Sequence, residues 1–113
     1  MKYELTKLSL ASGLKDIILY RLATSVTLEN ATCYVNTYQN GREAGYEISV
    51  YLPKQPIKKV TITEYRNSDQ IVVYHDNTAC QGLTEDAYKN TKVFNYNDYN
   101  GVIEHCTNYL GAL

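Results

Sequence analysis

The chain has 113 residues, of which 44% are hydrophobic and 20% charged, and its formal net charge is −1. This length suits a single domain over residues 1–113, and the composition is too apolar for an intrinsically disordered chain. Charges of either sign form no long run, and no segment reaches the roughly 20 apolar residues of a membrane span, so we expect neither nucleic acid nor membrane as a partner.

The N-terminal part of the chain predicts a helix preceded by an ambiguous segment. Residues 2–10 alternate loosely between apolar and polar, so they form either a first strand or a helical lead-in. From Ser12, a candidate N-cap, apolar residues recur at spacings of three and four. This stripe predicts an amphipathic helix of about three to four turns, with Leu14, Ile17, Ile18, Leu22 and Val26 on one side.

Asn40-Gly41 is the strongest turn signal in the chain. It lies between residues 31–38 and 44–52, two runs rich in β-branched and aromatic residues, and both turn positions tolerate positive φ. A two-residue turn there predicts a hairpin with one apolar face, on which the cross-strand pairs are Ala31 with Val50, Cys33 with Ile48 and Val35 with Tyr46.

The other face of this hairpin carries hydroxyl and polar side chains. In the predicted register Thr32, Tyr34, Asn36 and Tyr38 lie across from Ser49, Glu47, Gly45 and Glu43, with Tyr51 just beyond. The ring of tyrosine is apolar, but its hydroxyl needs a polar partner or water. We therefore expect this face to be exposed to solvent.

A second hairpin is predicted between residues 57–65 and 70–76, with Asn67-Ser68 as its turn. This turn signal is weaker because neither residue is glycine, and a longer loop through Arg66 and Asp69 would shift the register. With the short turn, one face pairs Val60 with His75, Ile62 with Val73 and Glu64 with Ile71. The other face holds Thr61, Thr63, Tyr65, Val72 and Tyr74.

Three short elements are predicted after His75. Thr84 as N-cap, followed by two acidic residues, indicates a short helix, and residues 92–96 form a fifth or edge strand. Asp98 caps a final helix that ends at Gly111. The apolar stripe of that helix consists of Tyr99, Val102, Ile103, Cys106, Tyr109 and Leu110.

Together these elements predict a two-layer α+β domain with a mostly antiparallel four- or five-stranded sheet, an N-terminal helix and a C-terminal helix. The N-terminal helix packs on the apolar face, and the C-terminal helix lies beside it or across the sheet edge. If residues 2–10 are a strand, the element order over residues 2–76 is similar to the cystatin-like arrangement. The turn Gln39-Asn40-Gly41-Arg42-Glu43 lacks the Q-x-V-x-G loop that carries inhibition in that family, so the resemblance transfers no function.

The cysteines and the N-terminus indicate a reducing compartment. Cys33, Cys80 and Cys106 are an odd number at wide spacing, which favours free thiols over a disulfide framework. The first residues lack the apolar stretch of a signal peptide. We therefore expect a cytoplasmic protein.

The histidines and cysteines are the candidates for catalysis or metal binding, but their spacing argues against both. His75 and Asp76 are neighbours in a strand and point to opposite faces, and His105 and Cys106 project about 100° apart on a helix. The order His75, Cys80, His105, Cys106 lacks the paired short spacings of a zinc site. A nucleophilic pair of Cys80 with His75 or His105 has no supporting signature. We expect no metal and no cofactor.

Tyrosine is the remaining distinctive feature, with twelve Tyr against one Phe and no Trp. Either the C-terminal helix or a second copy of the chain covers these side chains, or they bind a protein, because Tyr offers a large rigid contact area at low entropy cost. Acidic side chains on the same face disfavour stacking on single-stranded nucleic acid. We call this sheet face the tyrosine face, and its candidate protein-binding residues are Tyr34, Asn36, Tyr38, Glu47, Tyr51, Tyr65 and Tyr74.

We therefore expect a small non-enzymatic module that inhibits a protein target, of the immunity or phage anti-defence (anti-CRISPR) kind. That biological role rests on the small size, the lack of catalytic motifs and the Asn-, Lys- and Tyr-rich composition. Two alternatives remain: a small enzyme or ligand-binding domain with a pocket near His75 and Cys80, and a homodimeric structural protein.

Overall fold

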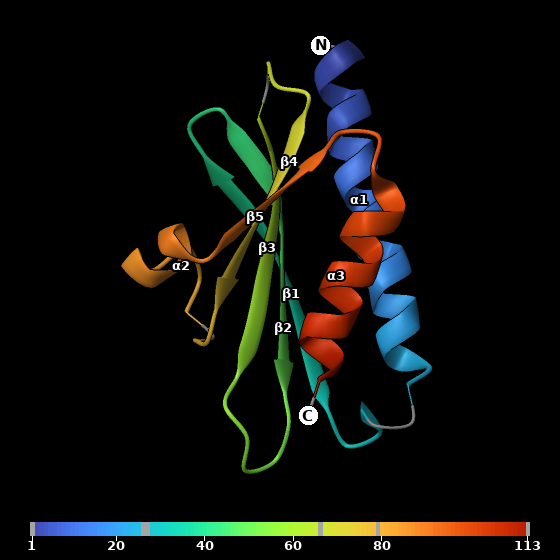
Figure 1. The fold of residues 1–113 in the computed structure, drawn as a ribbon, viewed down its shortest axis with the longest axis vertical. Helices are drawn as coiled ribbons and strands as arrows, with labels where there is room; N and C mark the ends of the chain where they lie inside the picture. The colour runs from blue at the N-terminus through green and yellow to red at the C-terminus, as the bar shows by residue number, and fades with distance from the viewer. Residues whose placement is uncertain (1, 26–27, 66, 79, 113) are drawn as a thin grey trace.

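The fold is a five-stranded antiparallel sheet with both long helices on the same face (Figure 1). The computed structural model describes residues 2–25, 28–65, 67–78 and 80–112. The strand order is β1-β2-β3-β4-β5, so each strand pairs with its neighbours in the sequence. The predicted α+β fold class is confirmed, and the elements are α1 (Lys2–Ala23), β1 (Thr32–Asn40), β2 (Glu43–Tyr51), β3 (Lys58–Tyr65), β4 (Gln70–Asp76), α2 (Glu85–Lys89), β5 (Thr91–Asn95) and α3 (Tyr99–Gly111).

Helix α1 begins at Lys2 and includes the whole ambiguous segment. The strand alternative for residues 2–10 is therefore wrong. The cystatin-like element order required that strand, so it is wrong as well. Ser12 lies inside the helix rather than at its N-cap, because the apolar stripe extends further towards the N-terminus: Leu10 and Ala11 pack inward in line with Leu14. Val26 falls outside the described residues.

The register of the first hairpin differs from the prediction by two residues. The observed pairs are Cys33 with Val50, Val35 with Ile48 and Thr37 with Tyr46. The central turn residues are Gly41 and Arg42, and only Gly41 has positive φ (+61°), as in a type II′ turn. Asn40 is then free to extend the ladder. Because the shift is by two residues, every side chain keeps its predicted face.

The second hairpin and the helix caps match the sequence pattern. Val60 pairs with His75, Ile62 with Val73 and Glu64 with Ile71, which confirms the predicted register. The Thr84 hydroxyl accepts a hydrogen bond from the backbone N–H of Ala87 at 3.3 Å. Asp98 accepts from Gly101 N–H at 3.1 Å, so the predicted N-caps of α2 and α3 are confirmed.

The core lies between the sheet and the paired helices α1 and α3. We call this side of the sheet the helix face. Cys33 and Val35 were predicted to join the core, but Cys33 is exposed and Val35 is 38% exposed. The reason is that β1 is an edge strand, whereas α1 packs over β2 and β3. The buried core cluster comprises Leu14, Ile18, Leu22, Leu28, Ile48, Val50, Val60, Ile62, Ile71, Val73, Phe94, Val102, Ile103, Cys106 and Leu110.

Candidate functional site

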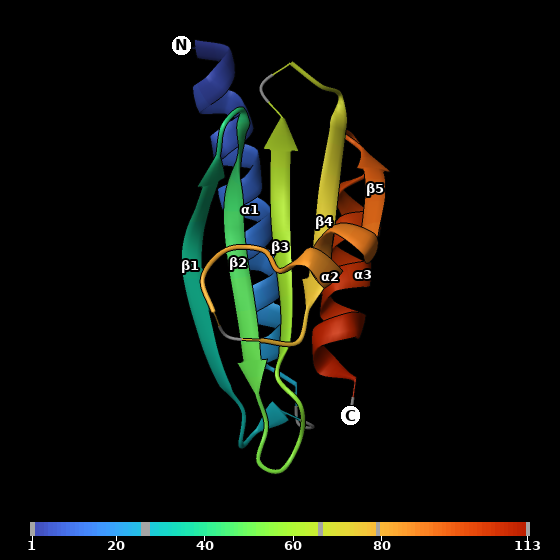
Figure 2. The same ribbon diagram turned by 90° about the vertical axis from the view of Figure 1, so that its left-hand side faces the viewer.

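The tyrosine face is partly covered by the chain that connects β4 to β5. Residues 77–78 and 80–90, which we call the cover segment, run across the sheet on the side opposite α1 and α3 and include α2 (Figure 2). Beneath it Thr61 and Thr63 are fully buried. The expectation of a wet face is therefore wrong for its central part, because a segment without a strong helix or strand pattern folds back over it.

Lys59 anchors the cover segment from below. Its ammonium group donates to the backbone carbonyls of Cys80 and Gly82, each at 2.7 Å. It also lies 3.6 Å from Glu47 Oε2 and 3.9 Å from Asp76 Oδ2. The Lys59 residue is only 1% exposed. A buried cation of this kind is tolerable only because carboxylates and carbonyls surround it.

The two carboxylates beside Lys59 also bind the cover segment. Asp76 accepts from the Thr84 hydroxyl at 3.0 and 3.1 Å and from the backbone N–H of Asn77 at 3.0 Å. Glu47 Oε2 accepts from Gly82 N–H at 2.8 Å. Glu47 was a candidate binding residue, but it is buried and its charge is directed inward. It holds the cover segment in place instead of facing a partner.

A second buried cluster surrounds Glu43 at the other end of the face. The hydroxyls of Tyr38 and Tyr74 donate to its carboxylate at 3.0 and 2.6 Å. The Thr63 hydroxyl donates to the carbonyl of Val72 at 2.8 Å and lies 3.3 Å from the Glu43 carboxylate. Tyr38 is 7% exposed and Tyr74 6%. Burial, and then the hydrogen bond to Glu43, raise the pKa of Tyr74 above its usual range, and burial likewise raises the pKa of Tyr38. These two candidate residues are therefore out of reach of a partner.

The open part of the tyrosine face lies over β1 and β2. Tyr34 is 55% exposed, and its ring meets that of Tyr51 edge to face, with centroids 5.1 Å apart. The two rings, with Thr32, Asn36 and Ser49, line a hollow of about 370 Å³. Tyr65 also remains at the surface, at the far end of β3. Four of the seven candidate residues are thus accessible: Tyr34, Asn36, Tyr51 and Tyr65.

Strand β1 forms the free edge beside this open part. Its nine residues contain no charged residue, proline or glycine, and its pairing with β2 has no bulge. In an antiparallel ladder alternate residues direct their backbone groups away from the partner strand. Because Asn40 and Glu43 close the two-residue turn as a bonded pair, the outward-directed residues of β1 are Cys33, Val35, Thr37 and Gln39.

The two histidines meet on the helix face, at the junction of β4, β5 and α3. Nε2 of His75 lies 2.6 Å from Nε2 of His105, and Tyr109 stacks edge-on against His75. The pair lines a cleft of about 550 Å³. The cleft also includes Asn77, but Cys80 of the predicted His75 pocket does not line it.

Sequence reasoning missed this pairing because the partners are 30 residues apart. A signal was available: in the predicted register His75 shares the face of Val60, and His105 precedes Cys106 of the buried stripe. Lys59 was missed for a similar reason. It occupies a central strand between strands that carry Glu47 and Asp76 on the same face. The predicted β3–β4 register already paired Lys59 with Asp76, but no pairing of β2 with β3 was predicted to bring Glu47 beside them.

The described helices include none that is both long and apolar enough to cross a membrane. All three cysteines are free thiols, and Cys106 is buried in the core, which raises its pKa to about 12.

Comparison of the chain with protein-family models, curated proteins and solved structures finds no match.

Proposed function

We propose that this protein is a small non-enzymatic binding module that recognises a protein target through the β1 edge and the adjoining Tyr34–Tyr51 pair. The proposal rests on the edge strand β1, which is uncharged and pairs with β2 without a bulge. Natural proteins protect long edge strands with charges, proline, bulges or a covering element. Charges, proline and bulges are all absent from the nine residues of β1, and seven of these residues are exposed. Such an edge is suited to accept a strand from another protein.

The side chains around this edge fit strand addition. Main-chain hydrogen bonds from the outward-directed residues of β1 would provide affinity, and side chains on both faces would provide specificity. Tyr34 presents an aromatic ring on one side, and Val35 and Cys33 present apolar surface on the other. Tyrosine is enriched among the residues that dominate binding energy at interfaces.

The biological role we propose is inhibition of that target in the cytoplasm, of the immunity or phage anti-defence (anti-CRISPR) kind. Its support is the small size of the chain, its composition and a surface that offers contact area instead of catalytic groups. Inhibition would follow if the added strand or the tyrosine pair occupied a site that the target needs for its own partner or substrate.

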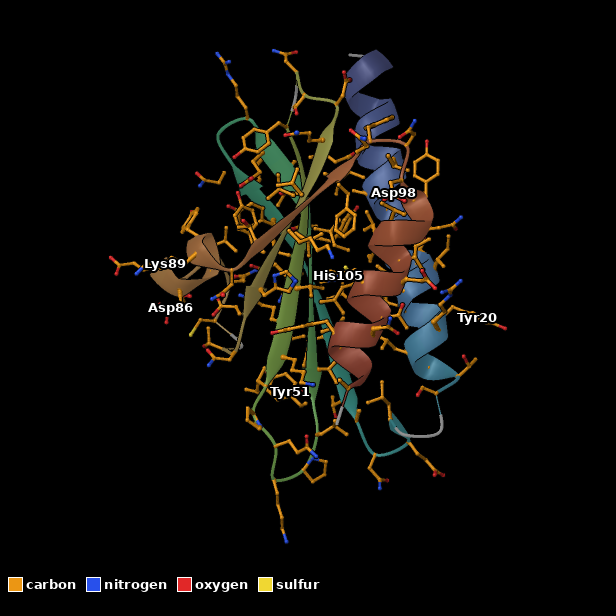
Figure 3. All side chains as sticks on the ribbon, viewed as in Figure 1. Tyr20, Tyr51, Asp86, Lys89, Asp98 and His105 are labelled. Carbon is orange, nitrogen blue, oxygen red and sulfur yellow. The ribbon has the colours of Figure 1, made fainter. Side chains whose placement is uncertain are left out.

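The test is affinity capture from bacterial lysates with matched variants. Val35→Lys places a charge on the edge, and Tyr34→Ala removes the exposed ring. Tyr20→Ala is the control, because Tyr20 is 72% exposed and points away from the sheet on α1 (Figure 3). We expect one protein that the wild type and Tyr20→Ala retain and that Val35→Lys and Tyr34→Ala lose. Equal capture by all four proteins would refute the proposed surface.

A homodimer is the second candidate for the same edge, since β1 carries no charge that would repel a second copy. Sedimentation of the wild type and of Val35→Lys separates the two. A dimer that dissociates in Val35→Lys would assign the edge to self-association. If the wild type is a monomer, the β1 edge is available to a different protein.

A further inference from the structure

The histidine pair is the feature of the molecule that the proposed binding surface does not use. His75 and His105 are the two histidines of the chain, and their Nε2 atoms face each other at 2.6 Å. His105 lies on the side of α3 that faces the sheet (Figure 3). Asn90, just before β5, places its carbonyl oxygen 2.6 Å from Nδ1 of His75. Three elements therefore converge on two imidazole rings.

The carbonyl of Asn90 determines which nitrogen of His75 carries the proton. A carbonyl oxygen only accepts hydrogen bonds, so Nδ1 of His75 is protonated and donates. In the neutral ring Nε2 then has a free lone pair, which is directed at His105. Histidines that ligate metals show the same arrangement, because their second ring N–H usually donates to a carbonyl or carboxylate.

Two ring nitrogens at 2.6 Å need an electrophile between them, since two lone pairs at that distance would repel. The electrophile is a shared proton or a metal ion. Metal–nitrogen bonds of about 2.0–2.1 Å place two adjacent ligand atoms roughly 3 Å apart, so a small rotation of the rings would admit an ion.

The surroundings allow water to complete the coordination. The cleft of about 550 Å³ that the pair lines is also bordered by Asp86, Lys92 and Tyr109. Within the described residues no third histidine, cysteine or acidic side chain is placed to join the pair. The Lys92 ammonium opposes a cation, but it lies over the ring of Phe94 at 5.6 Å from its centroid. A site here would therefore have two protein ligands.

We propose that His75 and His105 form a binding site for a divalent transition-metal ion, completed by water from the cleft. Imidazole suits Ni²⁺, Cu²⁺ and Zn²⁺ and does not suit Mg²⁺. The ion would join β4 to α3 and stabilise the folded state by mass action. The site lies apart from the β1 edge and does not depend on the function proposed for that edge.

The probe is Ni²⁺, with Mg²⁺ as the negative control. A Cys33→Ser/Cys80→Ser background removes the two exposed thiols, which also bind metals. We expect Ni²⁺, and not Mg²⁺, to raise the melting temperature of this protein. His75→Gln and His105→Gln should each weaken Ni²⁺ binding at least about tenfold in titration calorimetry. Lys92→Ala should strengthen it, because a repelling charge is removed.

A second measurement uses no histidine variant, so its result does not depend on whether the substituted proteins fold. Paramagnetic Ni²⁺ should selectively broaden the ring proton signals of both histidines in the NMR spectrum of the same background. Absence of a Ni²⁺-dependent shift and of broadening would overturn the proposal and assign the contact to a shared proton. Equal Ni²⁺ affinity in folded His75→Gln and His105→Gln proteins would overturn it as well.

Discussion

Both faces of this sheet contain buried groups, but different chemistry covers them. The helix face is covered by α1 and α3, with 22 and 13 residues, and its buried core is apolar except for Glu64 and the histidine pair. The tyrosine face is covered only in part, by the cover segment, and its buried polar groups are Lys59, Glu47, Asp76, Glu43 and two tyrosine hydroxyls. A short irregular segment has few apolar side chains to bury, so charges and hydrogen bonds hold it to the sheet.

Strand alternation identifies the side chains that share a face, but it does not show whether another segment covers that face. Apolar contacts tolerate some loss, because burial contributes in proportion to area. A buried ion cluster contributes little over an apolar replacement, yet breaking it is costly. A single substitution in the buried clusters of the tyrosine face should therefore lower the free energy of unfolding more than one in the apolar core.

The largest effect is expected at Lys59. Lys59→Met removes the cation and leaves the carboxylates of Glu47 and Asp76 buried without it, so the free energy of unfolding should fall by about 3–5 kcal/mol. Urea denaturation measures this. Lys89→Met, at an exposed position on α2, is the control and should change stability by less than about 0.5 kcal/mol.

A second substitution distinguishes the broken ion cluster from simple loss of packing. Adding Glu47→Leu to Lys59→Met removes one of the two stranded charges, so the double variant should be more stable than Lys59→Met alone. If the two losses simply add, the cluster is not an interacting unit and the comparison between the faces fails.

Tyr74→Phe should have the next largest effect. It deletes the hydroxyl that donates to Glu43 at 2.6 Å and leaves the ring in place. Loss of a buried hydrogen bond to a charged group should lower the free energy of unfolding by about 1.5–3 kcal/mol. Tyr99→Phe, on the exposed ring of α3, is the matched control and should be close to neutral. Equal effects from the two substitutions would show that Glu43 does not need this donor.

The two faces should also lose their contributions to stability at opposite ends of the pH scale. The folded-state pKa of His105, on the helix face, is lowered below 6.5, so the unfolded chain binds the proton better. The contribution of neutral His105 to stability is then fully present above a pH of about 6.5. It is lost as the pH falls through the folded-state pKa. The pKa of Tyr38 and Tyr74 is raised above 10, so their contribution is full below pH 10 and is lost as the pH rises further.

Urea denaturation across the pH range checks both limbs. His105→Gln should flatten the acid limb and leave the alkaline limb unchanged. Tyr74→Phe should reduce the alkaline limb only. If either variant alters the opposite limb, the assignment of acid and alkaline sensitivity to separate faces is wrong.

The smallest effect on stability is expected at the open part of the tyrosine face. Tyr34→Ala removes a ring that is 55% exposed and has no hydrogen bond to the buried clusters described above, so stability should change by about 0.5 kcal/mol or less. Thermal unfolding measures it. Loss of more than about 2 kcal/mol would show that the Tyr34–Tyr51 pair is part of the packing and would remove it from the candidate binding surface.

Much of the local structure could be predicted from the residues alone. The apolar spacings of Leu14, Ile18 and Leu22 and of Val102, Cys106 and Leu110 identified most of the packed sides of both long helices. Ile17 and Tyr99 were predicted on the same stripes, but they are 44% and 42% exposed. The N-caps Thr84 and Asp98 and the register between β3 and β4 were also predicted. The first hairpin was misaligned because Asn40-Gly41 suits a type I′ turn as well as Gly41 suits a type II′ turn, and only the completed ladder selects one.

The candidate sites depended on contacts that no local pattern contains. Lys59 meets Gly82 across 23 residues, and His75 meets His105 across 30. Propensity, alternation and capping act within a few residues, so they determined the elements and the two faces of each strand. Burial of three of the seven candidate residues, exposure of the β1 edge and convergence of the two histidines depended on how distant segments packed together, because burial depends on what lies across the sheet.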